Sequence, residues 1–228
     1  MISIIIPVYN HQDALERALA SIQKQTYKDI EVIVVDDGSD PEILIFNFQF
    51  PIKLLRQENM GAPVARNKGM ELAKGDYVIF WDADVVAEPE MLDKMVHALE
   101  QNPKASFVYS NHYFGKKKMT GRVFDGDSLQ KVNYIHSTSL IRRKDAIRWD
   151  ESLKRFQDWD LWLTMADQGK SGVWIDEYLF RVDTGGTMSS WLPSFAYRKP
   201  WSLLPGIRER VRKYELSRDI VRKKHELT

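Results

Sequence analysis

The sequence predicts an α/β fold in which a mostly parallel central sheet is flanked by helices. Several short runs are continuously apolar and rich in Ile and Val, which is typical of strands buried on both faces of a parallel sheet. These runs alternate with stretches whose apolar residues recur at helical spacing, and clusters of turn-forming residues separate them. The 228 residues, 43% of them hydrophobic, are enough for one full core.

The first half of the chain alternates regularly between the two patterns. The run "ISIIIPV" predicts the first strand, and "HQDALERALASIQKQ" predicts a helix whose start Asn10 is placed to cap. Pro63 in the first turn and Gly75 near the end mark a second helix. We expect strands over residues 2–8, 30–35, 51–57, 76–81 and 106–111, and helices over residues 11–25, 62–75 and 89–102.

The second half is less regular. The segment "GKKKMTG" (115–121) is typical of a hairpin tip, and "STSLIRR" (137–143) predicts a strand. A helix is expected over residues 158–169, closed by Gly169, followed by a strand over residues 172–182.

Charge and composition exclude several classes of protein. A formal net charge of +1 gives no general attraction to nucleic acid, so we expect no nucleic-acid partner. The chain contains no cysteine, and its five histidines lack zinc-ligand spacing. The apolar run at residues 1–8 is too short to span a membrane and has no basic flank, so we expect neither a signal peptide nor an anchor. The expected location is cytoplasmic, either soluble or peripheral on the inner face of a membrane.

Polar segments follow three of the expected parallel strands. They are "VYN", "DDGSD" and "DADVV", and open parallel sheets bind ligands beyond the carboxyl ends of their strands. In the third segment, Asp82 and Asp84 form an i, i+2 pair, which on an extended chain points both carboxylates to one side. Such a pair is costly unless a cation lies close by, and its hard oxygens suit Mg²⁺ or Mn²⁺.

None of these features is specific when taken alone. The chain has three D-x-D triplets, and a solvated turn explains any of them, most readily the one at residues 125–127. Arg66 can pair with a phosphate, but taken alone it is explained more readily by a salt bridge on a helix surface. Acids such as Asp158 and Asp160 are favoured at a helix start whatever the function.

Four motifs, in this order and spacing, carry a resemblance to a known family. They are "SIIIPVYN", "IEVIVVDDGSD", "NMGAPVARNKGMELAKGDYVIFWDAD" and "FQDWDLWLTM". Together they resemble family 2 of the inverting glycosyltransferases, which have the GT-A fold, and the resemblance covers about residues 1–190. It implies a nucleotide-sugar donor, with uridine as the usual base, a divalent cation (Mn²⁺ or Mg²⁺), and direct displacement at the anomeric carbon. The acceptor implied is a hydroxyl of a glycan, a lipid-linked sugar or another molecule.

The resemblance also implies a division of the chain. Residues 1–110 would form the nucleotide-sugar-binding half, and residues 111–190 the acceptor-binding and catalytic half of the same domain. The implied donor-binding residues are Pro7 and Tyr9 lining the base pocket, Asp37 contacting the base with Asp36 supporting that turn, Arg66 near the nucleotide, and Asp82 near the ribose.

The remaining implied roles concern the metal and the chemistry. Asp84 matches the second acid of the family's D-x-D, a direct metal ligand, and Asp158 matches the acid that removes the proton of the acceptor hydroxyl. Two positions depart from the family pattern. Gln157 replaces the Glu that commonly precedes the catalytic Asp, and Asp183 stands where many members have a metal-binding His.

Two alternatives remain open from the sequence. A sugar nucleotidyltransferase also uses acids and a metal, although "PVYNHQDA" lacks the Gly-rich phosphate loop expected after its first strand. A non-catalytic sugar-binding or nucleotide-binding module descended from the enzyme is compatible with Gln157 and Asp183.

The tail, residues 191–228, is expected to be a basic amphipathic extension. Residues 206–228 carry eight Lys or Arg against four Asp or Glu, an excess of 8 − 4 = +4. An apolar stripe at helical spacing, interrupted by Arg218, follows an aromatic and aliphatic patch formed by Trp191, Phe195, Trp201, Leu203 and Leu204. Two interpretations fit: a solvated helix that docks on the domain through the stripe, or a segment that holds the protein on anionic lipid.

Overall fold

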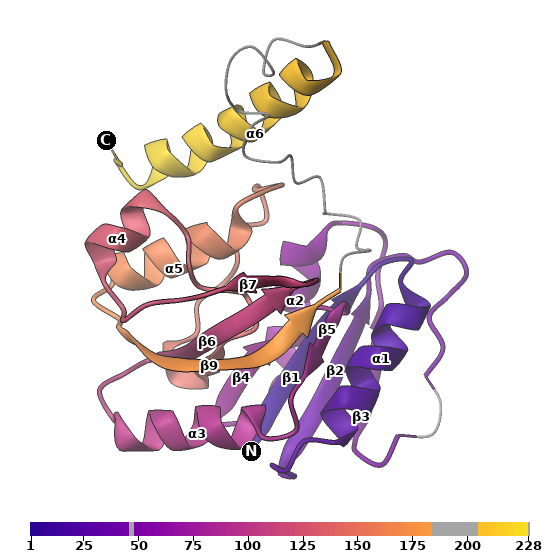
Figure 1. The fold of residues 1–228 in the computed structure, drawn as a ribbon. Helices are drawn as coiled ribbons and strands as arrows, with labels where there is room; N and C mark the ends of the chain where they lie inside the picture. The colour runs from indigo at the N-terminus through magenta and orange to yellow at the C-terminus, as the bar shows by residue number, and fades with distance from the viewer. Residues whose placement is uncertain (46–47, 184–204, 228) are drawn as a thin grey trace.

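The structure is a computed structural model that describes residues 1–45, 48–183 and 205–227. Within these residues, nine strands form one sheet in the order β3-β2-β1-β4-β8-β6-β9-β5, with β7 paired to β6 (Figure 1). The strands are β1 (Ile2–Val8), β2 (Ile30–Asp36), β3 (Ile52–Arg56), β4 (Tyr77–Phe80), β5 (Val85–Ala87), β6 (Phe107–Phe114), β7 (Lys117–Met119), β8 (Leu140–Arg142) and β9 (Gly172–Val182). The helices are α1 (Gln12–Gln23), α2 (Ala62–Leu72), α3 (Met91–Gln101), α4 (Gly126–Lys131), α5 (Gln157–Asp167) and α6 (Pro205–Lys224).

The four strands of the first half form the parallel part of the sheet. β1 pairs in parallel with both β2 and β4, and β2 pairs in parallel with β3. Alternate residues of β1 enter different cores: Ile4 packs with α1 and α3 on one face, and Ile5 packs with α2 and α5 on the other. Burial on both faces explains why the first strand is continuously apolar, and it confirms the expected α/β fold.

The second half turns the sheet from parallel to mixed. β8 runs antiparallel to both β4 and β6, so β6 points the same way as β4, and β9 is parallel to β6. The carboxyl ends of β4, β6 and β9 therefore share one edge with those of β1 and β2. β6 continues through residue 110, where we divided the two halves, and the strand expected over residues 137–143 is shorter than predicted.

One expectation about the first loop is wrong. Asn10 does not cap α1, whose N-cap residue is His11. Asn10 adopts a left-handed conformation (φ 54°), and its side-chain oxygen accepts a hydrogen bond from the backbone of Asp40 at 2.8 Å. Its own N–H donates to Ser39 Oγ at 2.9 Å. Asn10 thus ties the loop after β1 to the loop after β2, and this fixes the position of the neighbouring Tyr9.

The tail forms α6, which docks on α5 through the stripe that the sequence predicted. Val211 and Val221 are buried, and the ring of Tyr214 lies 4.9 Å from that of Phe156. The aromatic and aliphatic patch that precedes the helix lies outside the described residues. In the part of the chain that the structure describes, no helix is both long and apolar enough to cross a bilayer.

Candidate active site

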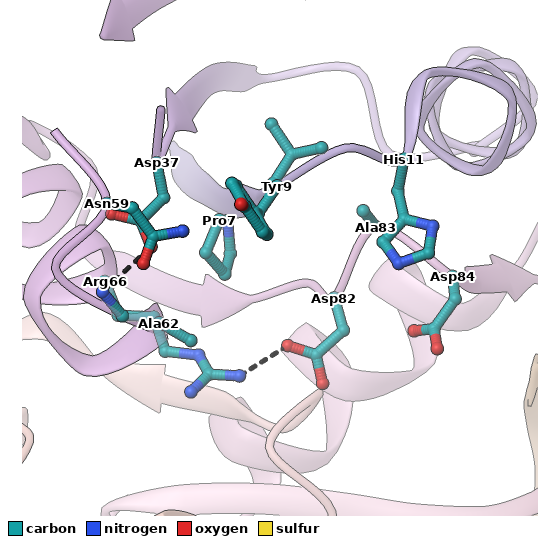
Figure 2. Close-up of a pocket in the computed structure, with 12 residues that line it drawn as sticks. Pro7, Tyr9, His11, Asp37, Asn59, Ala62, Arg66, Asp82, Ala83 and Asp84 are labelled. Atoms are coloured by element: carbon teal, nitrogen blue, oxygen red, sulfur yellow. Dashed lines mark hydrogen bonds and ion pairs between the residues drawn. The ribbon is translucent and has the colours of Figure 1, made fainter. Parts of the chain in front are cut away.

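A cavity of about 330 Å³ opens at the carboxyl ends of β1, β2 and β4 (Figure 2). Six of the nine predicted site residues line it: Pro7, Tyr9, Asp37, Arg66, Asp82 and Asp84. The loop residues Asn59 and Gly61 and the helix residue Ala62 complete one wall. The structure therefore brings together the three polar strand ends, as the pattern of the sequence predicts.

Asp37 organises the wall of the cavity. Its carboxylate accepts hydrogen bonds from Gln57 Nε2 at 2.7 Å and from the backbone N–H groups of Met60 and Gly61 at 2.8 Å each. Gly61 has a φ of 96°, which favours glycine. Asp37 lines the cavity, and two carboxylate oxygens have more acceptor capacity than these three bonds use, so a ligand N–H can also bind it.

Asp36 supports the site from below and does not line the cavity. Its side chain is 2% exposed, accepts a hydrogen bond from the Ser39 N–H at 2.9 Å, and pairs with Arg56 at 2.8 Å. The resemblance places Asp36 among the donor-binding residues, as a support for the turn that carries Asp37. Both carboxylate oxygens of Asp36 hold the turn after β2, which leaves it this supporting role and no place in the cavity wall.

Arg66 is buried and lines the cavity, so the alternative of a salt bridge on the helix surface is wrong. Its guanidinium donates to Asp82 Oδ1 at 2.7 Å and to Gln157 Oε1 at 3.2 Å, and it lies 4.3 Å from the ring centre of Trp149. The Nε atom is buried and has no hydrogen-bond partner among the described residues. Arg66 therefore connects α2, the turn after β4 and the start of α5 at the base of the cavity.

Asp82 is held as a carboxylate. Burial alone would raise its pKa, but the charge of Arg66 and hydrogen bonds from Arg66 and Ser137 outweigh burial and hold the pKa below its usual value. The Ser137 hydroxyl donates to Asp82 Oδ2 at 2.7 Å. Both oxygens of Asp82 thus have protein partners.

Asp84 has a different environment from Asp82. The two residues lie in a turn between β4 and β5, not on an extended chain as we expected, because the Val85 N–H bonds back to the Asp82 carbonyl at 3.0 Å. Burial, reinforced by the negative charge of Asp82, raises the pKa of Asp84 to about 7. Repulsion between neighbouring carboxylates is what a bound cation relieves.

Asp183 lies beside Asp84 and not in the first cavity. Its backbone N–H donates to the Asp84 carbonyl at 2.9 Å, and both side chains line an adjoining cavity of about 340 Å³. Asp183 also pairs with Arg17 at 3.1 Å. No cluster of three ligating side chains occurs within the described ranges. The residues present therefore suit a cation that binds one or two carboxylates and takes its other ligands from phosphate and water oxygens.

Asp158 is the second residue of α5. Its Oδ2 accepts a hydrogen bond from Asn133 Nδ2 at 2.7 Å. Burial raises its pKa, against the charges of His136 and Arg66. Asp158 does not line the cavity, but it follows Gln157, which bonds to the cavity residue Arg66. Gln157, at the position of the family's Glu, bonds to Arg66 and so holds this end of α5 against the site.

Three residues of the site escaped the sequence analysis, namely Asn133, His136 and Ser137. All lie between α4 and β8, in a segment without periodicity. Burial lowers the pKa of His136, whose Nδ1 accepts a hydrogen bond from the Thr138 N–H at 3.0 Å. The only available signal was the polar composition of "NYIHSTS", which is equally typical of an ordinary loop.

Comparisons with known proteins agree with this geometry. Residues 3–152 match glycosyl transferase family 2. An uncharacterised glycosyltransferase of Haemophilus influenzae is 39% identical over 111 residues, which cover 48% of this chain and 38% of that protein. The UDP-Glc:alpha-D-GlcNAc-diphosphoundecaprenol beta-1,3-glucosyltransferase WfaP of Escherichia coli is 29% identical over 204 residues, 83% of this chain and 80% of that protein. The chain thus spans well under half of one of these relatives and most of the other.

Solved structures show the same fold at low sequence identity. TarS 1–349 of S. aureus in complex with UDP-GlcNAc has a TM-score of 0.67 and 19% identity, covering 95% of this chain and 66% of that one. The mannosyltransferase PcManGT of Pyrobaculum calidifontis, in complex with GDP-Man and Mn²⁺, has a TM-score of 0.62 and 18% identity, covering 83% of this chain and 58% of that one. From the match over residues 3–152 and this shared architecture, we conclude that the chain belongs to glycosyl transferase family 2 and has the GT-A fold.

Proposed function

We propose that the protein transfers a sugar from a uridine diphosphate sugar to an acceptor hydroxyl in glycan biosynthesis, with inversion and with a divalent cation. The observation that carries the proposal is the cavity at the strand ends, which gathers six of the predicted donor and metal residues. TarS in complex with UDP-GlcNAc and PcManGT in complex with GDP-Man and Mn²⁺ support it by fold.

Binding of the donor would use the wall and the base of the cavity. Tyr9 is 40% exposed at the mouth, where its ring can stack on a base, and Asp37 offers acceptor oxygens to a base N–H. Arg66 provides positive charge at the base of the cavity, and its planar side chain is already fixed by Asp82 and Trp149. This preorganisation lowers the entropy cost of holding the diphosphate.

Asp84 and Asp183 are the residues that would hold Mn²⁺ or Mg²⁺. When bound, such a cation neutralises the charge that develops on the diphosphate as the sugar bond breaks. The protein's own part is to keep the two carboxylates at one cavity, with Asp84 fixed by the turn after β4. Asp183 would exchange its exposed pair with Arg17 for this role.

Asp158 would accept the proton of the attacking hydroxyl. The amide of Asn133 orients its carboxylate, and burial raises its pKa, which makes it a stronger base than an exposed Asp. Attack from the side of α5, opposite the diphosphate, displaces the leaving group in line and inverts the anomeric centre. General-base catalysis of this kind contributes ~10²- to 10⁴-fold in rate.

One relative supports a proposal for the class of acceptor. The name of WfaP describes glucosyl transfer to GlcNAc-diphosphoundecaprenol, so we propose a lipid-linked or glycan hydroxyl as the acceptor here. Membership of glycosyl transferase family 2 disfavours the sugar nucleotidyltransferase alternative. The alternative of a non-catalytic module is distinguished from an enzyme by the donor screen described next.

A donor screen tests the proposed function. The purified chain is titrated calorimetrically with UDP, GDP and their sugars, with and without Mn²⁺, and hydrolysis or transfer to a lipid-linked GlcNAc acceptor is followed in parallel. We expect Mn²⁺-dependent binding of UDP-sugars together with turnover. Tight binding without turnover of any donor would identify a non-catalytic module, preferential binding of GDP-sugars would correct the base, and no nucleotide binding would overturn the proposal.

A further inference from the structure

One face of α6 is fastened to the catalytic half of the domain. Val221 is fully buried there, and Tyr214 packs on Phe156. Beyond this apolar contact, Lys224 Nζ lies 2.8 Å from an oxygen of Asp160 and 2.7 Å from an oxygen of Asp150.

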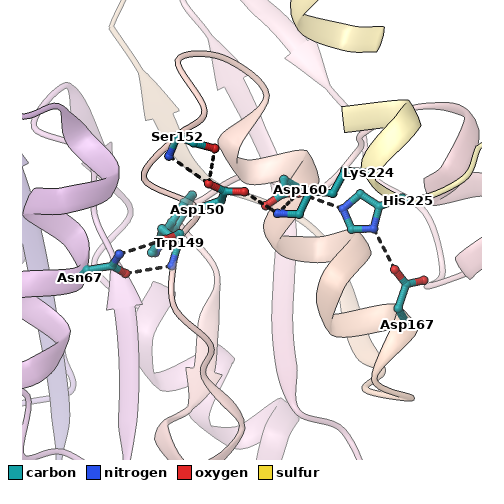
Figure 3. Close-up of polar contacts among 8 residues, drawn as sticks. All are labelled: Asn67, Trp149, Asp150, Ser152, Asp160, Asp167, Lys224 and His225. Atoms are coloured by element: carbon teal, nitrogen blue, oxygen red, sulfur yellow. Dashed lines mark hydrogen bonds and ion pairs between the residues drawn. The ribbon is translucent and has the colours of Figure 1, made fainter. Parts of the chain in front are cut away.

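The last turn strengthens this attachment (Figure 3). His225 contacts Asp160 at 2.9 Å through Nε2 and Asp167 at 2.8 Å through Nδ1. Because Asp160 and Asp167 both belong to α5, the tail is fixed to the helix that carries Asp158. α6 is therefore held in one orientation, and its opposite face is presented to the surroundings (Figure 1).

That opposite face combines two aliphatic side chains with basic ones. Leu216 is 54% exposed and Ile220 is 56% exposed, and they lie one helical turn apart. At 100° per residue, Arg212, Lys213 and Lys223 lie on the same side of the helix as these two, and all three are exposed. We call these five residues the outer face of α6. Glu209 lies on this side as well and pairs with Lys213 at 2.8 Å, so the basic residues still exceed the acidic one.

The positive charge of the chain is concentrated on this segment. Residues 206–228 have an excess of +4, whereas the whole chain has a net charge of +1, so residues 1–205 have a net charge of 1 − 4 = −3. The net charge of residues 1–205 opposes an anionic surface, although Lys116, Lys117 and Lys118 form a smaller exposed basic cluster there, whereas the tail has a net positive charge that attracts such a surface. This asymmetry would orient the molecule with α6 toward the surface.

We propose that the outer face of α6 binds the surface of an anionic lipid bilayer. Leu216 and Ile220 insert at the level of the headgroups, and Arg212, Lys213 and Lys223 contact lipid phosphates. Basic side chains that flank exposed aliphatic ones are the pattern of interfacial helices, whereas an anionic polymer such as nucleic acid would need only the cations.

The position of the surface has a consequence for catalysis, and this consequence rests on the proposed function. Tyr214, on the docked side of α6, touches Phe156, which is two residues before Asp158. A bilayer on the outer face would thus lie about one helix diameter, roughly 10–12 Å, from the start of α5. A lipid-linked sugar presented from that bilayer can reach the proposed base.

Vesicle co-sedimentation tests the proposal with the full chain. Vesicles of phosphatidylcholine alone are compared with vesicles that also contain phosphatidylglycerol, at low and at high salt. The first variant carries Leu216→Gln with Ile220→Gln, and the second carries Arg212→Gln, Lys213→Gln and Lys223→Gln. The matched control carries Leu44→Gln with Val123→Gln, whose side chains are 55% and 72% exposed elsewhere on the domain.

We expect salt-sensitive binding to the anionic vesicles only. The aliphatic variant should bind roughly tenfold more weakly, because it lacks the two aliphatic side chains that would become buried in the bilayer. The basic variant should lose its salt-sensitive binding, and the control should bind as the unaltered chain does. Circular dichroism and hydrolysis of a soluble donor, which should be unchanged, verify that each variant is folded.

Three outcomes would overturn the proposal. They are negligible binding of the unaltered chain to anionic vesicles at low salt, equal weakening by the control, and binding that is undiminished in the aliphatic variant and competed by an oligonucleotide. Vesicle binding by a chain that proves inactive on every donor would support this surface while refuting the proposed function, so the two can fail separately.

Discussion

Arg66 and Asp82 form a salt bridge of 2.7 Å, in which the Arg66 side chain is 5% exposed and the Asp82 side chain 24% exposed. The pair joins α2 to the turn after β4 at the base of the cavity, and the Arg66 guanidinium also stacks on Trp149. The attraction between the two charges offsets the cost of desolvating them, so the pair matters chiefly when one partner is lost and the other is left buried without it.

The variant Arg66→Met should destabilise the protein and weaken donor binding. It leaves Asp82 with Ser137 as its hydrogen-bond donor and without a cation, and such losses cost about 3 kcal/mol. Urea unfolding measures the free energy, and calorimetry with UDP measures the affinity. The control is Arg148→Met, which removes exposed pairs with Glu71 and Glu151 and should change stability by less than about 1 kcal/mol. Equal effects of the two variants would contradict the special role of Arg66.

The variant Asp158→Asn should retain donor binding and lose transfer by ~10²-fold or more, because an amide cannot accept the proton. Single-turnover transfer and calorimetry separate the two effects. Asp160→Asn is the informative comparison, because Asp160 lies in the same first turn of α5 but its carboxylate pairs with Lys224 and His225 of the tail. It should lower stability while leaving the pH profile of transfer intact. Near-normal transfer by Asp158→Asn would require another base.

The regular half of the fold can be predicted from the sequence, because parallel strands that are buried on both faces require continuous runs of apolar residues. β1 is predicted with its observed bounds, and β9 likewise, since both end at turn-forming or polar residues. β5 is not predictable in this way. It has three residues and exists because Val85 and Ala87 pair with β9, almost a hundred residues further along the chain.

The same distinction holds for the site. Asp82 and Asp84 stand out because they follow a buried strand, and Asp37 because it follows another. His136 and Ser137 reach the site only because the chain between α4 and β8 folds back to Asp82. Asn10 was misread for a related reason, because its partner Asp40 lies on another loop. Contacts between loops leave no periodic pattern in the sequence.

The variant Asp84→Ala should abolish the metal dependence of nucleotide binding. Without the Asp84 carboxylate, Asp183 is the one remaining acid of the proposed metal pair, and it is engaged by Arg17. Calorimetry of UDP binding with Mn²⁺ and with chelator measures the effect: the affinity of the unaltered protein should fall in chelator, and that of the variant should be low in both. Asp13→Ala, a change at an acid lining the same second cavity, is the control and should retain the response to Mn²⁺. Undiminished binding of the unaltered protein in chelator would refute the metal's role.

Buried His112 should make the fold sensitive to acid. Its ring stacks on Phe180 at 5.0 Å, and burial, followed by the charge of His136, lowers its pKa to about 3. The unfolded chain takes up a proton near the ordinary pKa of about 6.5, so between pH 6.5 and 3 it binds more protons than the folded state. Stability therefore falls as the pH is lowered through this window. In His112→Phe the decline should be shallower, by up to about 1.4 kcal/mol per pH unit. Urea unfolding across the window measures both slopes, and parallel slopes would show that His112 does not contribute.

Close contact between α2 and β1 gives the last prediction. A Cβ at Gly69 would lie 2.4 Å from Cγ2 of Ile5, so Gly69→Ala cannot be accommodated unless the Ile5 side chain, the helix or the strand shifts. Overpacking of this kind costs about 1–3 kcal/mol, and the better helix propensity of Ala recovers less than about 1 kcal/mol of it. Because Ile5 is two residues before Pro7, the displacement should also weaken UDP binding. The matched control is Gly126→Ala in the first turn of α4, where no atom lies within 4 Å of the added Cβ; it should be neutral or slightly stabilising. Urea unfolding and calorimetry with UDP compare the two variants. Equal stability and equal UDP affinity would mean that the contact between α2 and β1 adjusts to the added methyl group without affecting the cavity.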